Sequence, residues 1–253
     1  AEVMADVCDD LLVMYPPVGP RRAARLAALA RRVTLTVALD SETAARELSR
    51  AATDAGVRVR VLVELDAGMH RVGLPSPGAA ATLGAAVAAL PGLALAGIAF
   101  YPGHIRGPVG EQAAQLAARG ALVGEARAVF AKAGLPVEVV SAGSTPTMWA
   151  THRIEGITEM RPGTYIYNDR TTAEIGACSM EDCALTVLAT VVSTAVPDQA
   201  VIDAGTKSLG REPIRGVGGD KSDSGGFGCL ADRPEVVVRS MSEEHGILDL
   251  SGT

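Results

Sequence analysis

Polar and charged residues closely follow an apolar stretch in the segment VELDAGMHRVGL, residues 63–74. The segment contains Asp66, Gly68, His70, Arg71 and Gly73. An arginine just past a strand end, beside a glycine that lets the backbone turn, can hold a phenolate, a carboxylate or a phosphate. The alternative is a structural ion pair between Arg71 and either Asp66 or Glu64. The spacing alone leaves both interpretations open.

A histidine has a similar position in YPGHIRGP, residues 101–108. His104 comes four residues after an apolar stretch and follows Gly103, so a ligand could approach the backbone closely there. Histidine titrates near neutral pH, which suits a general base, and its ring can also stack on a ligand. A solvated loop histidine without a function is the competing interpretation.

Two further segments could bind an anion. SAGSTPT, residues 141–147, contains Gly143, Ser144, Thr145 and Thr147. Backbone N–H groups and hydroxyls at the start of a helical turn suit a phosphate, although an ordinary serine and threonine turn has the same composition. MRPGTYIYND, residues 160–169, contains Arg161, Gly163, Tyr165 and Tyr167. Phosphate loops after the last two strands of a barrel are a recurrent arrangement.

Each of these segments follows an apolar stretch, and such stretches alternate with alanine-rich ones of helical period. Strands are predicted at 9–19, 33–40, 59–65, 93–100, 135–143 and 157–161. Helices are predicted at 20–32, 41–56, 76–90, 110–134 and 146–150, the second beginning at a Ser41 cap and ending at Gly56. Apolar, β-branched runs without polar alternation are typical of parallel strands covered on both faces.

Six βα units could form an open doubly wound sheet or most of an eight-stranded barrel. An open sheet needs a glycine-rich turn after its first strand, and YPPVG at 15–19 is too stiff for that. A barrel collects its chemistry at the carboxyl ends of the strands, where all four segments fall. The sequence predicts an incomplete (β/α)8 TIM-type barrel over 1–182. Because AEVMADV reads as the tail of a helix, we expect the natural chain to begin earlier and two βα units to be absent.

The character of the sequence changes near residue 183. The stretches 184–196, 199–205 and 235–246 are rich in β-forming residues and are separated by turn residues. We expect the start of a β-rich C-terminal domain over 183–253. The glycine-rich stretch 215–228 is interpreted as a surface loop rather than a phosphate cradle, because no helix follows it.

Composition limits the classes of function. A net charge of -6 and an aromatic content of 3% disfavour nucleic acid, which rewards basic and stacking surfaces. No apolar run reaches the roughly 18 residues of a membrane span, and the N-terminus is unlike a secretory signal. The four cysteines form no C-x-x-C pair and are interpreted as reduced thiols. We expect a cytoplasmic protein that binds neither nucleic acid nor membrane.

VELDAGMHRVGL resembles the D-x-G-M-x-R-x-G segment of the alanine racemase group, the fold type III pyridoxal-phosphate enzymes, which are built as a barrel followed by a β-domain. YPGH, SAGSTPT, EMRPGTY and MSEEHG are more similar to the D-threonine aldolase and D-serine dehydratase branch of that group. The similarity runs over essentially the whole chain. It implies a pyridoxal 5'-phosphate-dependent lyase that cleaves D-threonine-like β-hydroxy amino acids or dehydrates D-serine.

The resemblance also implies a role for each matching residue. Arg71 would hydrogen-bond the phenolic oxygen of the cofactor, and His104 would act as a base over the ring with Tyr101 beside it. The residues that would hold the phosphate are Gly143, Ser144, Thr145, Gly163 and Thr164. Arg161 and Tyr165 would lie in the same pocket. Asp66 is then a structural brace for its turn, and His70 occupies the variable position of the motif.

Two parts of the family pattern fall outside this chain. The Schiff-base lysine lies at the end of the first barrel strand, and none of Lys132, Lys207 and Lys221 occupies that position. The metal-binding histidine lies beyond residue 253, so a divalent metal (Mn, Mg or Zn) would be bound by residues outside this chain. We interpret the chain as an internal piece, inactive alone, of a homodimeric enzyme whose partners are small D-amino acid substrates.

Other functions stay open at this point. An amino-acid racemase of the same fold is the nearest alternative, and product analysis separates it from a lyase. A non-catalytic pyridoxal-phosphate-binding barrel would be consistent with the missing lysine. A sugar-phosphate barrel enzyme would use the SAGSTPT anion site but leave the Arg71 and His104 segments unexplained.

Overall fold

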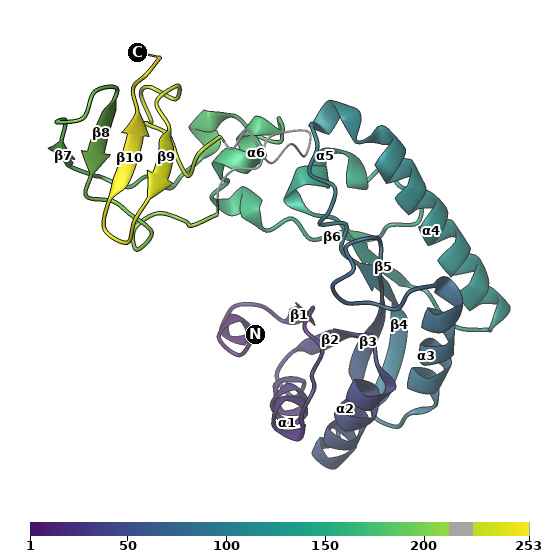
Figure 1. Cartoon of the computed structure of the whole chain (residues 1–253). Helices are drawn as coiled ribbons and strands as arrows, with labels where there is room; N and C mark the ends of the chain where they lie inside the picture. Colours follow the sequence, from purple (N-terminus) through teal and green to yellow (C-terminus); the bar gives the residue numbers. More distant parts are fainter. Residues whose placement is uncertain (213–224, 253) are drawn as a thin grey trace. The chain divides into compact units, whose positions relative to one another are not determined.

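The computed structural model describes residues 1–212 and 225–252, and the chain divides into two compact units. The first unit contains residues 1–105 and 112–162, and the second contains residues 106–111 and 163–253. Each has its own sheet and its own hydrophobic core (Figure 1). The predicted domain limit after residue 182 lies inside the second unit and stays a prediction.

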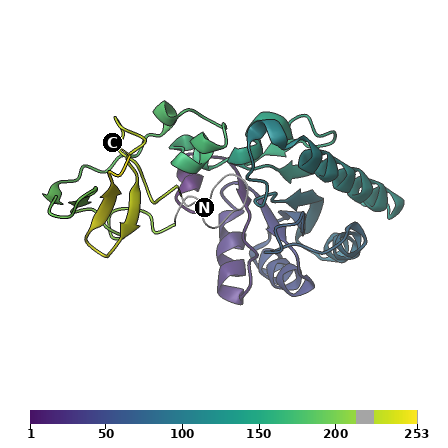
Figure 2. The ribbon, with the colours of Figure 1, turned by 45° about the horizontal axis from the view of Figure 1, so that its top comes forward.

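The sheet of the first unit contains six parallel strands in chain order, counted over the described residues. They are β1 (Asp10–Val13), β2 (Thr34–Leu39), β3 (Val59–Leu65), β4 (Leu93–Phe100), β5 (Val139–Ala142) and β6 (Glu159–Met160). The helices that connect them are α1 (Pro20–Leu29), α2 (Glu42–Ala55), α3 (Pro77–Ala89), α4 (Ala113–Lys132) and α5 (Met148–Thr151). Helices α1 to α4 lie along one face of the curled sheet (Figures 1 and 2). This arrangement confirms the predicted incomplete TIM-type barrel.

Local capping explains where the helices begin and end. The side chain of Ser41 accepts a hydrogen bond from Ala44 N at 3.3 Å, and Gly56 ends α2 in a left-handed conformation with φ 65°. Both predictions for this helix are confirmed. The last two strands are shorter than predicted, because β6 pairs with β5 only through Glu159 and Met160.

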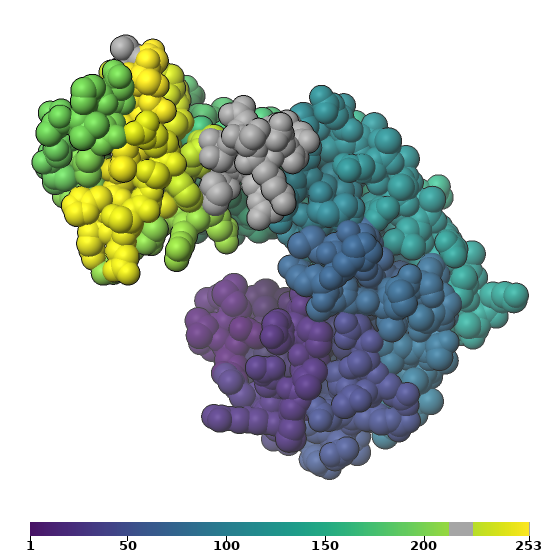
Figure 3. Space-filling view, in the orientation of Figure 1, coloured from purple at the N-terminus to yellow at the C-terminus, as the bar shows by residue number. Residues whose placement is uncertain are grey.

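The core of the first unit has an outer and an inner layer. On β3, Val61, Val63 and Leu65 pack in the outer layer, against the helices. Leu62 packs in the inner layer, whose buried residues are Ala38, Leu62, Ala96 and Ala99. Because side chains alternate along a strand, Glu64 shares the inward face with Leu62. In the space-filling view α3 and α4 touch along the outer surface (Figure 3).

The second unit is built around a small antiparallel sheet. Its order is β7-β8-β10-β9, formed by β7 (Val191–Ser193), β8 (Gln199–Ile202), β10 (Gly246–Asp249) and β9 (Val238–Met241). Of the predicted strand over 184–196 only β7 pairs with a neighbour, and Leu188 is fully exposed at 101%. The unit also contains η4 (Thr164–Ile166) and α6 (Arg170–Glu174), which Asp169 caps. No described helix of either unit has the length and apolar character to cross a membrane.

Candidate active site

Asp66 organises the turn that follows β3. Its Oδ1 accepts hydrogen bonds from the N–H groups of Gly68 at 2.9 Å and His70 at 3.0 Å, and its Oδ2 lies 2.6 Å from His70 Nδ1. Burial opposes the ionisation of Asp66, but the hydrogen bonds from His70 and Gly68 outweigh it and lower the pKa. The predicted role of Asp66 as a structural brace is confirmed.

Gly73 brings the far end of this turn back onto the strand. Its φ is 101°, its N–H donates to Asp40 Oδ2 at 2.9 Å, and Leu74 next to it bridges Leu65. A Cβ atom at Gly73 would lie 2.5 Å from Asp66 N and 2.5 Å from Leu65 C. Only glycine therefore fits, and the turn holds Arg71 over the end of the sheet.

Arg71 and Tyr101 come together from two different turns. The guanidinium carbon of Arg71 lies 4.9 Å from the centroid of the Tyr101 ring, a cation–π arrangement. Among the described residues Arg71 has no carboxylate within ion-pair distance, and Asp66 contacts His70 instead. The structural ion pair between Arg71 and Asp66 or Glu64 is therefore wrong. Arg71 is exposed, so its N–H groups can reach a ligand.

His104 lies against the turn after β3, from its own turn after β4. A Cβ atom at Gly68, whose φ is 103°, would be 3.1 Å from His104 Cε1 and 3.1 Å from Arg119 Nη1. Although the His104 side chain is exposed, the surrounding protein displaces part of its hydration, and this effect and the Arg119 charge lower its pKa. A lowered pKa keeps the imidazole neutral and able to accept a proton at neutral pH.

Arg161 points back toward the sheet from the end of β6. Its Nε donates to Ser141 Oγ at 2.7 Å and its Nη2 to the Phe100 carbonyl at 2.7 Å. These bonds tie together the carboxyl ends of β4, β5 and β6. Burial lowers the pKa of Arg161, and the carboxyl groups of Glu64 and Glu159 oppose that effect.

The SAGSTPT segment forms a closed, buried turn. Ser144 is 3% exposed, its Oγ lies 3.1 Å from Thr147 Oγ1, and its N–H donates to the same oxygen at 3.2 Å. Thr145, 2% exposed, begins the short helix η3 (Thr145–Thr147), and Gly143 precedes it with φ 88°. The two hydroxyls thus bond to each other, as in an ordinary capped turn, and a role in phosphate binding stays a prediction.

The remaining predicted residues do not belong to these turns. Gly163, Thr164 and Tyr165 belong to the second unit, and all three are exposed. Lys132 ends α4, and Lys207 forms ion pairs with Glu243 and Glu244. Lys221 and residues 215–224 of the predicted loop lie outside the described residues. Among the described residues no group of three or more histidine, cysteine and acidic side chains could hold a metal ion.

Sequence reasoning gave no role in this region to Asp40 and Arg119, named Glu64 only as an alternative partner of Arg71, and named Ser141 only as the start of the SAGSTPT segment. Asp40 holds the Gly73 N–H, Arg119 lies beside His104, Ser141 holds Arg161, and Glu64 is buried behind them. Glu64 carried a usable signal, because it is an acid on an otherwise apolar predicted strand. Arg119 carried none, because an arginine within an alanine-rich helix is usually on the solvated face.

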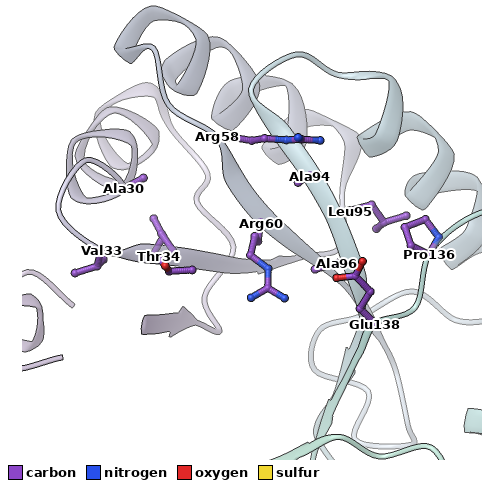
Figure 4. A pocket seen from close by; sticks show the side chains of 11 residues that line it. Ala30, Val33, Thr34, Arg58, Arg60, Ala94, Leu95, Ala96, Pro136 and Glu138 are labelled. Atoms are coloured by element: carbon purple, nitrogen blue, oxygen red, sulfur yellow. The ribbon is translucent and has the colours of Figure 1, made fainter. Parts of the chain in front are cut away.

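A separate hollow lies at the opposite, amino ends of the strands (Figure 4). Its volume is about 660 Å³. Among the residues that line it are Thr34, Arg58, Arg60, Ala94 and Glu138, near the starts of β2, β3, β4 and β5. None of the predicted site residues lines it. A large opening and the candidate chemistry therefore lie at different ends of the same sheet.

Comparisons with known proteins agree with this fold. Residues 9–171 match the family "Alanine racemase, N-terminal domain", and residues 184–253 match the "Putative serine dehydratase domain". D-threo-3-hydroxyaspartate dehydratase of Delftia sp. is 34% identical over 91% of this chain and 63% of its own length. D-threonine aldolase of Arthrobacter sp. is 27% identical over 94% of this chain and 61% of its own length.

Solved structures give the same result. The crystal structure of D-threonine aldolase from Filomicrobium marinum superposes with a TM-score of 0.81 at 30% identity, covering 98% of this chain and 65% of that one. D-threo-3-hydroxyaspartate dehydratase from Delftia sp. HT23 superposes with a TM-score of 0.82 at 30% identity, covering 98% and 67%. The chain thus spans somewhat more than three fifths of the length of the curated relatives it matches. The resemblance found in the sequence is confirmed.

Proposed function

The chain belongs to the alanine racemase N-terminal domain family, and from that premise we propose that it is part of a pyridoxal 5'-phosphate-dependent lyase acting on D-β-hydroxy amino acids. The observation that carries the proposal is the meeting of Arg71, Tyr101 and His104 at the carboxyl end of the sheet. The names of the relatives support the substrate class, since they are an aldolase and a dehydratase of D-amino acids.

The donor set at this end of the sheet fits a phosphorylated, anionic cofactor. Three guanidinium groups gather there, those of Arg71, Arg119 and Arg161. Arginine is the residue best suited to phosphate and to an anionic ring oxygen. In addition, Glu64 Oε2 and Arg119 Nε are buried without a hydrogen-bond partner among the described residues. Buried polar atoms of this kind are expected where a bound group completes the network.

The cofactor, when bound, supplies the electron sink for the bond broken at the substrate Cα. Arg71, held by its turn and by the Tyr101 ring, would donate hydrogen bonds to the anionic ring oxygen. His104, neutral at physiological pH, would accept the proton of the substrate β-hydroxyl as the Cα–Cβ bond breaks and the aldehyde leaves. In dehydration His104 would instead accept the proton from the substrate Cα, and the protonated imidazole would donate that proton to the departing hydroxyl, which leaves as water.

The phosphate is proposed to be held by Gly143, Ser144 and Thr145, with Gly163 and Thr164, and Tyr165 is proposed to complete the pocket. Backbone N–H groups are the donors we favour, because the Ser144 and Thr147 hydroxyls bond to each other. A divalent metal on the substrate hydroxyl, a homodimeric assembly and a cytoplasmic location are further parts of this proposal. All three come from the family resemblance, the cytoplasmic location also from the four free cysteines.

Product analysis tests the proposal. The protein would be loaded with pyridoxal 5'-phosphate and incubated separately with D-threonine, D-serine and D-threo-3-hydroxyaspartate, with the L-enantiomers as controls. We expect glycine and an aldehyde, or ammonia and a keto acid, from a D-substrate only. Formation of the opposite enantiomer would instead identify a racemase. Cofactor binding without any product, in the complete protein, would favour the non-catalytic binding protein.

A further inference from the structure

Glu64 is a buried acid without a role in the chemistry described above. It lies on the inward face of β3, two residues before Asp66, and it is 2% exposed. Its Oε2 has no hydrogen-bond partner among the described residues. A carboxyl group buried in this way is costly in its charged form unless other charges compensate it.

The charges around Glu64 come from three different elements. Among these charges, Arg161 from the end of β6 affects the pKa of Glu64 most. Asp40 from the end of β2 and Arg71 from the turn after β3 follow. The pKa of Arg161 is in turn affected by the charges of Glu159 and Tyr101. No described carboxylate forms an ion pair with Arg161 or Arg71, because the contacts of Arg161 are a hydroxyl and two carbonyl oxygens and Arg71 lies on an aromatic ring.

These surroundings place the pKa of Glu64 near neutral pH. Burial raises the pKa of Glu64 to about 7, although the two arginines favour its charged form. The group therefore exchanges its proton in the range in which cells operate. Each change in its charge alters the net charge next to the guanidinium groups of Arg71 and Arg161.

We propose that Glu64 is a positioning residue for the anionic cofactor: when protonated it leaves the positive charges of Arg71 and Arg161 available to the ligand, and when ionised it cancels part of them. This inference rests on the proposed function, because it assumes that the anion at this site is pyridoxal 5'-phosphate. An acid with a purely structural role would behave differently, since its replacement would weaken binding at every pH.

Titration of pyridoxal 5'-phosphate against the complete protein and its Glu64→Gln and Glu159→Gln variants separates the two roles. Dividing each variant's dissociation constant by that of the wild type at the same pH removes the titration of the ligand itself. Glu64→Gln should bind like the wild type at about pH 6 and roughly tenfold more tightly at about pH 8, since a coupling of one pKa unit is a factor of ten. Glu159→Gln removes a more exposed carboxylate near Arg161 and should show no such trend.

The outcomes distinguish this inference from the proposed function. A Glu64→Gln ratio that is the same at both pH values, or binding that is weaker at both, would overturn the inference and leave the proposed function standing. Failure of all three proteins to bind the cofactor would overturn the proposed function, and the inference with it.

Discussion

The two ends of the parallel sheet in the first unit are built differently. At the amino ends, Arg58, Thr34 and Glu138 are exposed and line a hollow of about 660 Å³. At the carboxyl ends, Asp66 is bound to backbone N–H groups and Glu64 is buried, while Arg71 and His104 are exposed beside them. The difference teaches that a large opening need not mark the proposed site. Ionisable groups that the fold keeps buried, near turns that only glycine can form, are a better indicator of a functional site.

The connections explain this difference. In a parallel sheet the turns at the carboxyl ends lead into the helices that follow, and here they carry Arg71, Tyr101 and His104 toward one another. The amino ends are entered from helices through short turns, and Thr34, Arg58 and Glu138 are exposed there. Four changes test this contrast, from the largest expected effect to the smallest.

Replacing one glycine at the carboxyl end of the sheet and one at the amino end should lower the unfolding free energy by unequal amounts. Gly73→Ala forces a Cβ atom to within 2.5 Å of the backbone of Leu65 and Asp66, so we expect a loss of about 3 kcal/mol or more in unfolding free energy. Gly134→Ala, at φ 69° in open space before β5, should cost only about 1 kcal/mol. Urea denaturation measures both. Equal losses would contradict the special role of the turn after β3.

Removing His104 should stop the chemistry without removing the cofactor. His104→Gln is expected to lower kcat on a D-β-hydroxy amino acid by about 10²–10⁴-fold, because the base is lost, with the affinity for pyridoxal 5'-phosphate nearly unchanged. His152→Gln, at the exposed end of α5, is the matched control and should keep full activity. Unchanged turnover in His104→Gln would assign the base to another residue.

Glu64 should make stability depend on pH. Its pKa of about 7 in the folded protein exceeds the ordinary value of 4.5, so the folded state holds the proton more tightly than the unfolded state. Wild-type stability should therefore fall relative to Glu64→Gln as pH rises from about 4.5 to about 7, by about 3 kcal/mol in total. Denaturation curves at several pH values measure this difference. A difference that does not vary with pH would show that Glu64 does not titrate there.

Arg119 should adjust the pH profile rather than the maximal rate. Its positive charge helps to lower the pKa of His104, so Arg119→Gln should raise that pKa and move the acid limb of kcat/KM to higher pH. The shift should be small, since His104 is exposed and the charge is screened. Arg58→Gln, at the amino ends, is the control and should leave the profile in place. A shift toward lower pH would contradict the assigned cause.

Much of the fold could be predicted from the sequence, and the site only in part. The spacing of apolar runs, the Ser41 cap and Gly56 predicted the βα units, because these signals are local. The turns that carry Arg71 and His104 were also visible, since glycines and strand ends mark them. The meeting of Arg71 with Tyr101 and of Arg161 with Ser141 could not be foreseen, because contacts between distant turns depend on how the sheet curls.

The bounds of the predicted strands also depend on contacts that the sequence does not show. The sequence predicts a strand over 184–196 from its β-forming residues, but only Val191–Ser193 pairs with β8. Propensity is present along the whole stretch, whereas a strand needs a partner for its N–H and C=O groups. Arg119 was missed for a related reason, since its place beside His104 depends on the packing of α4 against two turns.

The affinity for pyridoxal 5'-phosphate of two arginine variants, one from each end of the sheet, tests the central claim most directly. Equilibrium titration would compare the wild type with Arg71→Gln at the carboxyl ends and Arg60→Gln at the amino ends. We predict that Arg71→Gln weakens binding by about tenfold to a hundredfold, the effect of losing a charged hydrogen bond, and that Arg60→Gln binds like the wild type. Normal binding by Arg71→Gln together with weakened binding by Arg60→Gln would contradict the account and move the site to the other end.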